Sequence, residues 1–206
     1  FAALQAKIKN PRIDIVAPQG AHAPVLEVIN QFRQDAKLAQ VQLVVVATGR
    51  EAEDVAAALK SLSPESEILE FPSWETLPHE RLSPSPETVG TRLQVLHRLN
   101  EISALIEKKK LDHSVFVLAS VRAVLQPVVA GLANHPPLKL ERGKDYLLFE
   151  LSLKLVELAY QRVDMVTRRG EFAVRGGILD IFPTTAEHAM RLEFFRSEEH
   201  TSELQS

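Results

Sequence analysis

The sequence predicts an α/β fold: a Rossmann-like domain with a parallel sheet and a degenerate P-loop, followed by a small α+β domain with an antiparallel sheet. Helical and strand patterns alternate through roughly the first two thirds of the chain, which is typical of a parallel sheet. After the loop NHPP at residues 134–137, short strands follow one another directly, which favours antiparallel pairing. We therefore predict domains at residues 1–135 and 136–195.

Length and composition limit the class of protein. With 206 residues, 45% of them hydrophobic, the chain can bury a substantial core. No apolar run approaches the roughly 18 residues of a membrane span, and no basic-then-apolar leader opens the chain, so we expect a cytoplasmic protein with no membrane partner. The absence of cysteine excludes disulfides and thiolate metal sites. A formal net charge of -3 argues against autonomous binding of nucleic acid.

Both ends of the sequence look artificial. The chain starts at Phe1 within a helical pattern and without a methionine, so we expect further residues before it. Residues 196–206, RSEEHTSELQS, resemble the translation of a common sequencing-library adapter. We therefore expect this segment to be a processing scar and assign it neither fold nor function.

The first predicted unit has the layout of a phosphate-binding site. Residues 14–17 are predicted to form a short buried strand, and a loop with one glycine follows it. A helix is predicted from Pro24, with Val25, Val28, Ile29 and Phe32 on one face. A strand, a tight loop and a helix N-terminus together form the geometry that holds a nucleotide phosphate.

The side chains that a working phosphate loop needs are missing from this unit. Such a loop uses several glycines, a lysine for the phosphates and a hydroxyl for magnesium. The segment APQGAHAPV supplies Gly20 alone, and Pro24 removes a backbone N–H where the cradle needs one. We predict no magnesium ATP and no other cofactor here; contact of His22 with an anion is the less favoured alternative.

The other elements of the first domain follow from local patterns. Thr48 and Glu51 form a capping box that starts a helix with Ala52, Val55, Ala56 and Leu59 on its buried side. Ser85 and Pro86 start a long helix with apolar residues at helical spacing. Strands are predicted at residues 42–48, covered on both faces, at 67–71 and at 114–120, with a short helix then ending near Pro127.

The second domain is predicted to contain one helix and several short strands. Asp145 is expected to cap an amphipathic helix that runs through Tyr160. A turn at residues 168–170 is expected to join the first two of the later strands, and Gly176–Gly177 is expected to mark a bulge or a tight bend and not a ligand site. Strands are predicted at residues 138–143, 162–167, 171–176, 177–182 and 189–195.

Alternation along two of these strands places arginines on the outer face of the small sheet. Phe172 and Val174 point to one side, so Arg175 points to the other. By the same rule Met190, Leu192 and Phe194 share one face, which leaves Arg191, Glu193 and Phe195 opposite. Arginines and aromatics dominate interface hot spots, and a guanidinium can bind a carboxylate with two bonds. The alternative is that each arginine makes only a surface ion pair with Glu171, Asp180 or Glu193.

No motif indicates catalysis or a metal site. His79 stands beside Glu80 but lacks the second histidine of HExxH, and His97 lies on the polar side of its predicted helix. No GxSxG motif is present. We therefore predict no catalytic and no metal-binding residues.

Several segments resemble the N-terminal region of the bacterial transcription-repair coupling factor family. They are FPSWETLPHERLSP, VGTRLQVLHRL, VLASVRAVLQP, YQRVDMVTRRGEFAVRGGILDIFP and RLEFF, at residues 71–84, 89–99, 117–127, 160–183 and 191–195. The same module is similar to the excinuclease protein UvrB. UvrB carries an intact GSGKT loop and a long DNA-engaging hairpin, whereas this chain has neither.

The resemblance implies domains 1A and 2 of a DNA repair protein. It implies a noncatalytic fragment that recruits UvrA, with contacts at Arg175, Arg191 and Phe195, and with Arg162 as a further member by its match to UvrB. It places ATP, magnesium, RNA polymerase and double-stranded DNA with later domains of the family. One alternative is an ATP-dependent repair enzyme domain of UvrB or helicase type, and another is that domain 1A is only a structural platform.

Overall fold

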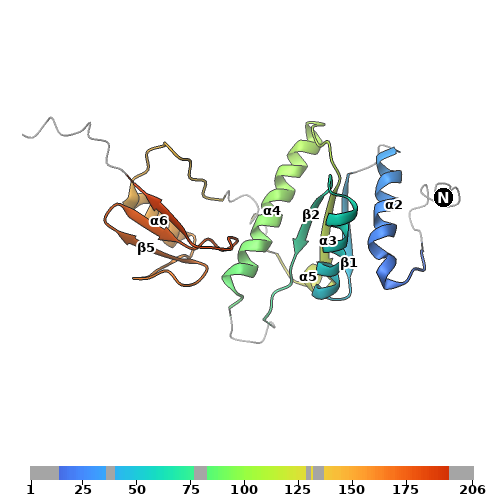
Figure 1. The fold of residues 1–206 in the computed structure, drawn as a ribbon, viewed down its shortest axis with the longest axis horizontal. Helices are drawn as coiled ribbons and strands as arrows, with labels where there is room; N and C mark the ends of the chain where they lie inside the picture. Colours follow the sequence, from blue (N-terminus) through green and yellow to red (C-terminus); the bar gives the residue numbers. More distant parts are fainter. Residues whose placement is uncertain (1–13, 36–39, 77–82, 129–130, 132–136, 195–206) are drawn as a thin grey trace, which may run out of the picture. The chain divides into compact units, whose positions relative to one another are not determined.

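The computed structural model describes residues 14–35, 40–76, 83–128, 131 and 137–194 (Figure 1). The chain divides into two compact units: residues 1–77 with 92–135, and residues 78–91 with 136–206. One division therefore falls at the predicted boundary of 135 and 136, whereas residues 78–91 group with the second unit.

The first unit is built on a parallel sheet, as predicted. Its strands are β1 (Val41–Val46), β2 (Glu67–Phe71) and β3 (Val115–Ser120), in the order β1-β3-β2. β3 pairs in parallel with both neighbours, with Val115 opposite Val41 and Glu67. All six residues of β3 are buried, because the strand is paired on both sides and covered on both faces.

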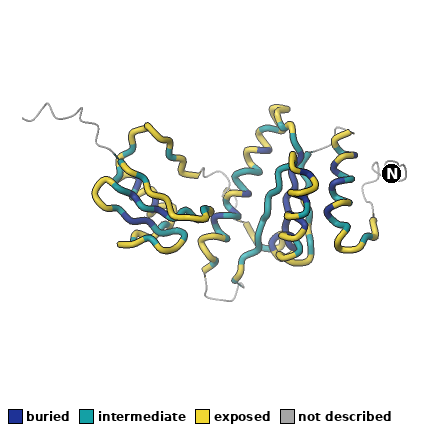
Figure 2. The backbone as a smooth tube through the Cα atoms, viewed as in Figure 1, coloured by how far each residue is buried: buried dark blue, intermediate teal, exposed yellow. Residues whose placement is uncertain are grey.

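Helices cover this sheet on both faces. The helical elements are η1 (Gln19–Ala21), α2 (His22–Asp35), α3 (Gly49–Leu62), α4 (Pro86–Glu107) and α5 (Val121–Leu125). On one face, α2 and α3 pack against Phe116 and Leu118 of β3. On the other, Val95 and Ile102 of α4 pack against Val115 and Val117, and Figure 2 shows the buried positions of both layers.

The start of α3 confirms the predicted capping chemistry. Thr48 Oγ1 accepts a hydrogen bond of 3.1 Å from the Glu51 backbone N–H. The Glu51 carboxylate accepts a second bond of 3.2 Å from the Ala47 N–H, one residue before the cap. Two N–H groups at the helix start are thereby satisfied.

The predicted strand at residues 14–17 is wrong. These residues pair with no strand in the described part of the chain, and Val16 is fully exposed. The prediction that β1 is covered on both faces is also wrong, since Leu43 is 61% and Val45 44% exposed. β1 lies at the edge of the sheet, where α4 does not cover these two residues.

The buried face of α2 also differs from the prediction. Helix α2 buries Phe32, as predicted, but it also buries Glu27 and Asn30, whereas Val28 and Ile29 are only half-buried. Gln42 of β1 donates a hydrogen bond of 2.9 Å to the Asn30 side chain. A polar contact between α2 and the edge strand therefore accompanies the apolar contacts that Ala23 and Leu26 make with the core.

The second unit is a four-stranded sheet covered by one helix. Its elements are α6 (Leu148–Glu157), β4 (Gln161–Arg162), β5 (Glu171–Arg175), β6 (Ile178–Ile181) and β7 (Met190–Glu193), with the strand order β4-β5-β6-β7. Leu151 and Leu155 of α6 pack against Phe172, Leu179 and Ile181 of the sheet. Helix and sheet thus share one core on the inner face.

This sheet is mixed and not purely antiparallel. β5–β6 and β6–β7 are antiparallel, but β4 pairs with β5 in parallel, with Arg162 opposite Phe172. Parallel pairing requires the intervening chain to reverse twice, and Glu171 stabilises that path. Its carboxylate accepts hydrogen bonds from the N–H groups of Thr167 (2.8 Å) and Arg168 (2.9 Å), which lower the pKa of Glu171.

Two local predictions at the start of this unit are wrong. Residues 138–143 form no strand, and α6 begins at Leu148 without a side-chain cap, so Asp145 does not start the helix. The Tyr146 hydroxyl accepts a hydrogen bond of 2.9 Å from the Glu141 N–H and closes a loop in this segment. That loop separates Asp145 from the helix start.

Candidate protein-binding face

The outer face of the second sheet consists of Ala173, Arg175, Ile178, Asp180, Arg191 and Glu193, of which Ala173 is buried. Ala173, Asp180 and Arg191 are paired across β5, β6 and β7, and Arg175, Ile178 and Glu193 form the next row. Paired residues project to the same side of a sheet. The structure therefore brings Arg175 and Arg191 together on the face opposite the core, as the alternation predicts.

Arg191 forms a bidentate ion pair with Asp180 on this face. Its Nε lies 2.7 Å from Asp180 Oδ1 and its Nη2 lies 2.9 Å from Oδ2. The hydrogen bonds raise the pKa of Arg191 and, with the charge of Arg175 as a smaller contribution, lower the pKa of Asp180. The predicted alternative, a surface ion pair with Asp180, is thus present for Arg191.

Arg175 ends β5 beside a two-residue hairpin. Its guanidinium donates to the backbone carbonyl of Asp164 and remains exposed. Gly176 has φ +58°, a conformation that favours glycine. A Cβ on Gly177 would lie 2.9 Å from the Phe194 carbonyl oxygen. The Phe194 N–H donates a hydrogen bond of 2.8 Å to the Gly177 carbonyl oxygen. The glycines therefore confirm the predicted tight bend and let β7 end against it.

Arg162 does not join the outer face. Because it pairs in parallel with Phe172, it lies on the core side of β4, contrary to its expected place beside the other arginines. There it lines an open hollow of about 310 Å³ with Phe149, Leu153 and Val156 of α6. Within the described part of the chain Arg162 makes no hydrogen bond or ion pair. Phe195, the remaining predicted contact residue, lies outside the described residues.

The loop at Gly20 lies beside carboxylates. Gln19, Gly20 and Ala23 line an open hollow of about 340 Å³ together with Glu51 and Asp54 of α3. His22 Nδ1 lies 3.4 Å from Glu51 Oε1. A helix N-terminus attracts anions, but here negative side chains already stand beside it and would repel a phosphate.

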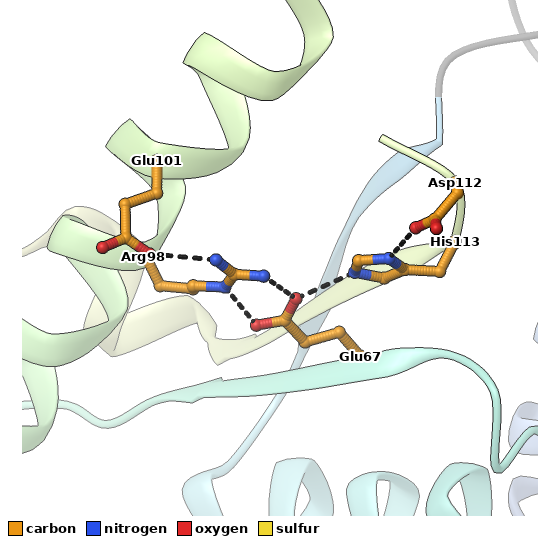
Figure 3. A network of polar contacts seen from close by, with 5 residues as sticks. All are labelled: Glu67, Arg98, Glu101, Asp112 and His113. Atoms are coloured by element: carbon orange, nitrogen blue, oxygen red, sulfur yellow. Dashed lines mark hydrogen bonds and ion pairs between the residues drawn. The ribbon is translucent and has the colours of Figure 1, made fainter. Parts of the chain in front are cut away.

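The first unit also holds a polar network that the sequence analysis missed (Figure 3). The Glu67 carboxylate accepts bonds from Arg98 Nε (2.7 Å) and Nη2 (2.9 Å), and lies 3.0 Å from His113 Nε2. Asp112 lies 2.9 Å from the other ring nitrogen of His113, and Glu101 lies 2.9 Å from Arg98. Arg98 chiefly lowers the pKa of Glu67, whereas Asp112 and then Glu67 raise the pKa of His113. Arg98–Glu101 and Asp112–His113 are local pairs, but Glu67 comes from a separate segment, so no sequence spacing indicates that it joins them.

A buried arginine lies nearby in the same unit. The Arg92 guanidinium lies 4.0 Å from the ring centre of Phe71 and 4.2 Å from that of Trp74, and it donates to the Pro72 carbonyl at 2.6 Å. Burial lowers the pKa of Arg92. This contact holds the start of the WETLPHE motif against α4.

The described part of the chain shows neither a metal-binding cluster nor a membrane-spanning helix. No group of three or more His, Asp or Glu side chains there could hold a metal ion. The described helices include none that is long and apolar enough to cross a membrane.

Comparison with known proteins matches residues 138–201 to the UvrB interaction domain family. The transcription-repair-coupling factor of Mycobacterium tuberculosis is 54% identical over 157 residues, which cover 76% of this chain and 12% of that protein. That of Bacillus subtilis is 35% identical over 148 residues, 72% of this chain and 12% of the relative. UvrABC system protein B of Aliivibrio fischeri is 38% identical over 107 residues, 49% of this chain and 14% of the relative.

The chain spans about an eighth of the length of the coupling factors that it matches. The similarity covers about three quarters of the chain, and the segment matched to the UvrB interaction domain contains the sheet that carries Arg175 and Arg191. The chain therefore belongs to the transcription-repair-coupling factor family and corresponds to its N-terminal region, with a UvrB interaction domain.

Proposed function

We propose that this chain is a noncatalytic recruitment module that binds UvrA and couples stalled transcription to nucleotide excision repair. One observation carries the proposal: Arg175 and Arg191 project from neighbouring rows of one face, while the buried Phe172 and the partly buried Leu192 of the same strands pack on the other. An exposed pair of arginines on a rigid sheet suits recognition of acidic groups on a protein partner. RNA polymerase, double-stranded DNA, ATP and magnesium belong, in this proposal, to other parts of the full-length cytoplasmic protein.

The proposed absence of ATP chemistry follows from the surroundings of Gly20. No lysine stands in the segment from Gln19 to Pro24, and Glu51 and Asp54 line the adjoining hollow. A triphosphate bound there would meet two carboxylates without a lysine from this segment to bind its phosphates. The similarity to UvrABC system protein B keeps an ATP-dependent repair enzyme as the second candidate. Calorimetry with magnesium ATP separates the two, since a measurable affinity would overturn the noncatalytic assignment.

Capture of purified UvrA by the immobilised chain tests the binding proposal. We expect Arg175→Ala and Arg191→Ala each to weaken capture at least about tenfold, because each removes a charged group from the outer face. Arg142→Ala is the matched control, since Arg142 is exposed in the same unit but lies before α6. Arg162→Ala tests separately whether a residue on the core side of β4 contributes to the capture of UvrA. Capture that the Arg175/Arg191 double variant leaves intact, with unchanged circular dichroism, would refute the proposal.

A further inference from the structure

We infer that Asp180 is a positioning residue, which holds Arg191 so that the free edge of its guanidinium faces a carboxylate of the protein partner. The inference rests on the proposed binding role of the outer face. It adds a residue that makes no contact with the partner itself.

The geometry of the ion pair leaves one edge of the guanidinium available. A guanidinium can bind carboxylates along two edges, one formed by Nε and Nη2 and the other by Nη1 and Nη2. Asp180 occupies the first edge, at 2.7 and 2.9 Å. Within the described residues Nη1 has no hydrogen-bond partner, and the Arg191 side chain is 61% exposed. The second edge is therefore open to a ligand.

Asp180 is well placed to act as a fixed support. It lies on β6, between β5 and β7, and its side chain is only 22% exposed. An unsupported arginine side chain samples many rotamers and loses that freedom when it binds. Because Asp180 already restricts the rotamers of Arg191, the guanidinium group is ordered before a partner carboxylate binds to it.

Asp180 also separates two like charges. Arg175 and Arg191 stand on opposite sides of β6, and the charge of Arg175 acts on Asp180 in addition to that of Arg191. Together with Glu193 on the same face, these side chains carry a formal net charge of 0, so the face offers no general attraction for a run of phosphates, whereas the open edge of Arg191 suits one carboxylate. We therefore assign the partner surface as an acidic protein segment, and duplex DNA is the alternative outcome of the test.

The decisive variant is Asp180→Asn, for which two explanations predict opposite results. Asparagine keeps the size of the side chain but removes one negative charge from the face and loses the bidentate acceptor. If Asp180 positions Arg191, affinity for UvrA falls about tenfold. If general attraction governs binding, affinity rises and the variant also gains affinity for duplex DNA. Either a tighter complex with UvrA or stronger DNA binding overturns the inference.

Three further variants complete the experiment, with affinity measured by surface plasmon resonance at two salt concentrations. Glu187→Gln makes the same change in net charge at an exposed loop residue and should stay within about twofold of the parent. Asp180→Glu keeps a carboxylate and should retain more affinity than Asp180→Asn. In the background of Arg191→Ala, Asp180→Asn should cause no further loss, because its effect acts through Arg191.

The outcomes separate this inference from the proposed function. If neither Arg175→Ala nor Arg191→Ala weakens binding, the proposed function fails. If both weaken binding and Asp180→Asn does not, only the positioning role fails. Urea unfolding of each variant, followed by circular dichroism, shows whether a loss reflects an unfolded sheet.

Discussion

Glu67→Gln should destabilise the first unit in a manner that depends on pH. The Glu67 carboxylate makes a bidentate contact with Arg98 and a third contact with His113, and its side chain is 24% exposed. Buried charged hydrogen bonds stabilise by about 1.5–3 kcal/mol, and exposed ion pairs by about 0–1 kcal/mol. For this partly exposed group we expect a loss of about 1.5 kcal/mol at pH 5.5, or roughly 5 °C in Tm.

The pH dependence follows from the opposite pKa shifts of the two partners. Folding raises the pKa of His113 from 6.5, so its contribution is full below pH 6.5 and is lost as the pH rises through the folded-state pKa. Folding lowers the pKa of Glu67 from 4.5, so its contribution is full above pH 4.5 and is lost as the pH falls through the folded-state pKa. Both contributions are therefore present at pH 5.5, and the contribution of His113 is reduced at pH 8.5.

The single tryptophan provides the assay. Trp74 belongs to the first unit, so its fluorescence during urea unfolding reports on the unit that contains the network. We expect the parent to lose stability between pH 5.5 and pH 8.5, and His113→Gln to lose less. The Glu67→Gln/His113→Gln double variant should be more stable than the sum of the single losses predicts, because the two residues share a contact. An equal pH dependence in parent and His113→Gln, together with additive losses, would refute the reasoning.

Other predictions test the core, the helix cap and the hairpin. Leu179→Ala should destabilise the second unit by about 3 kcal/mol, because Leu179 is fully buried in its core. Circular dichroism during urea unfolding measures the loss of stability, and a loss below about 1 kcal/mol would contradict the prediction. Thr48→Ala should cost about 1 kcal/mol by removing the acceptor for the Glu51 N–H, with Thr48→Ser as the control and Trp74 fluorescence as the measurement. Gly177→Ala should speed hydrogen exchange at the Phe194 amide, since the new Cβ would lie 2.9 Å from the Phe194 oxygen. Gly20→Ala, which has open space around it, should leave that exchange unchanged.

Local chemistry made much of the first unit predictable. The Thr48 cap, the Ser85–Pro86 helix start and the strand Glu67–Phe71 depend on residues close together in sequence, and all three are found in the structure. The order β1-β3-β2 depends on pairings between residues tens of positions apart, so no local pattern contains it. The hydrogen bond between Gln42 and Asn30 is a contact of the same kind, and it brings a polar residue to the buried side of α2 that the apolar pattern does not predict.

The candidate binding face was predictable only as far as strand alternation and hairpin length allow. A two-residue turn at Gly176–Gly177 sets Arg175 opposite Ile178 and so places Asp180 on the outer face, from local information alone. The pairing of Asp180 with Arg191 is not predictable in this way, because the register of β7 depends on how the long connection after β6 is folded. Arg162 shows the limit most clearly. The parallel register of β4 depends on the path of the chain between β4 and β5, which hydrogen bonds to Glu171 stabilise. This register places Arg162 opposite Phe172, on the core side of the sheet. A one-residue change in that register would move Arg162 to the outer face, so its role is decided by loop hydrogen bonds and not by the strand sequence.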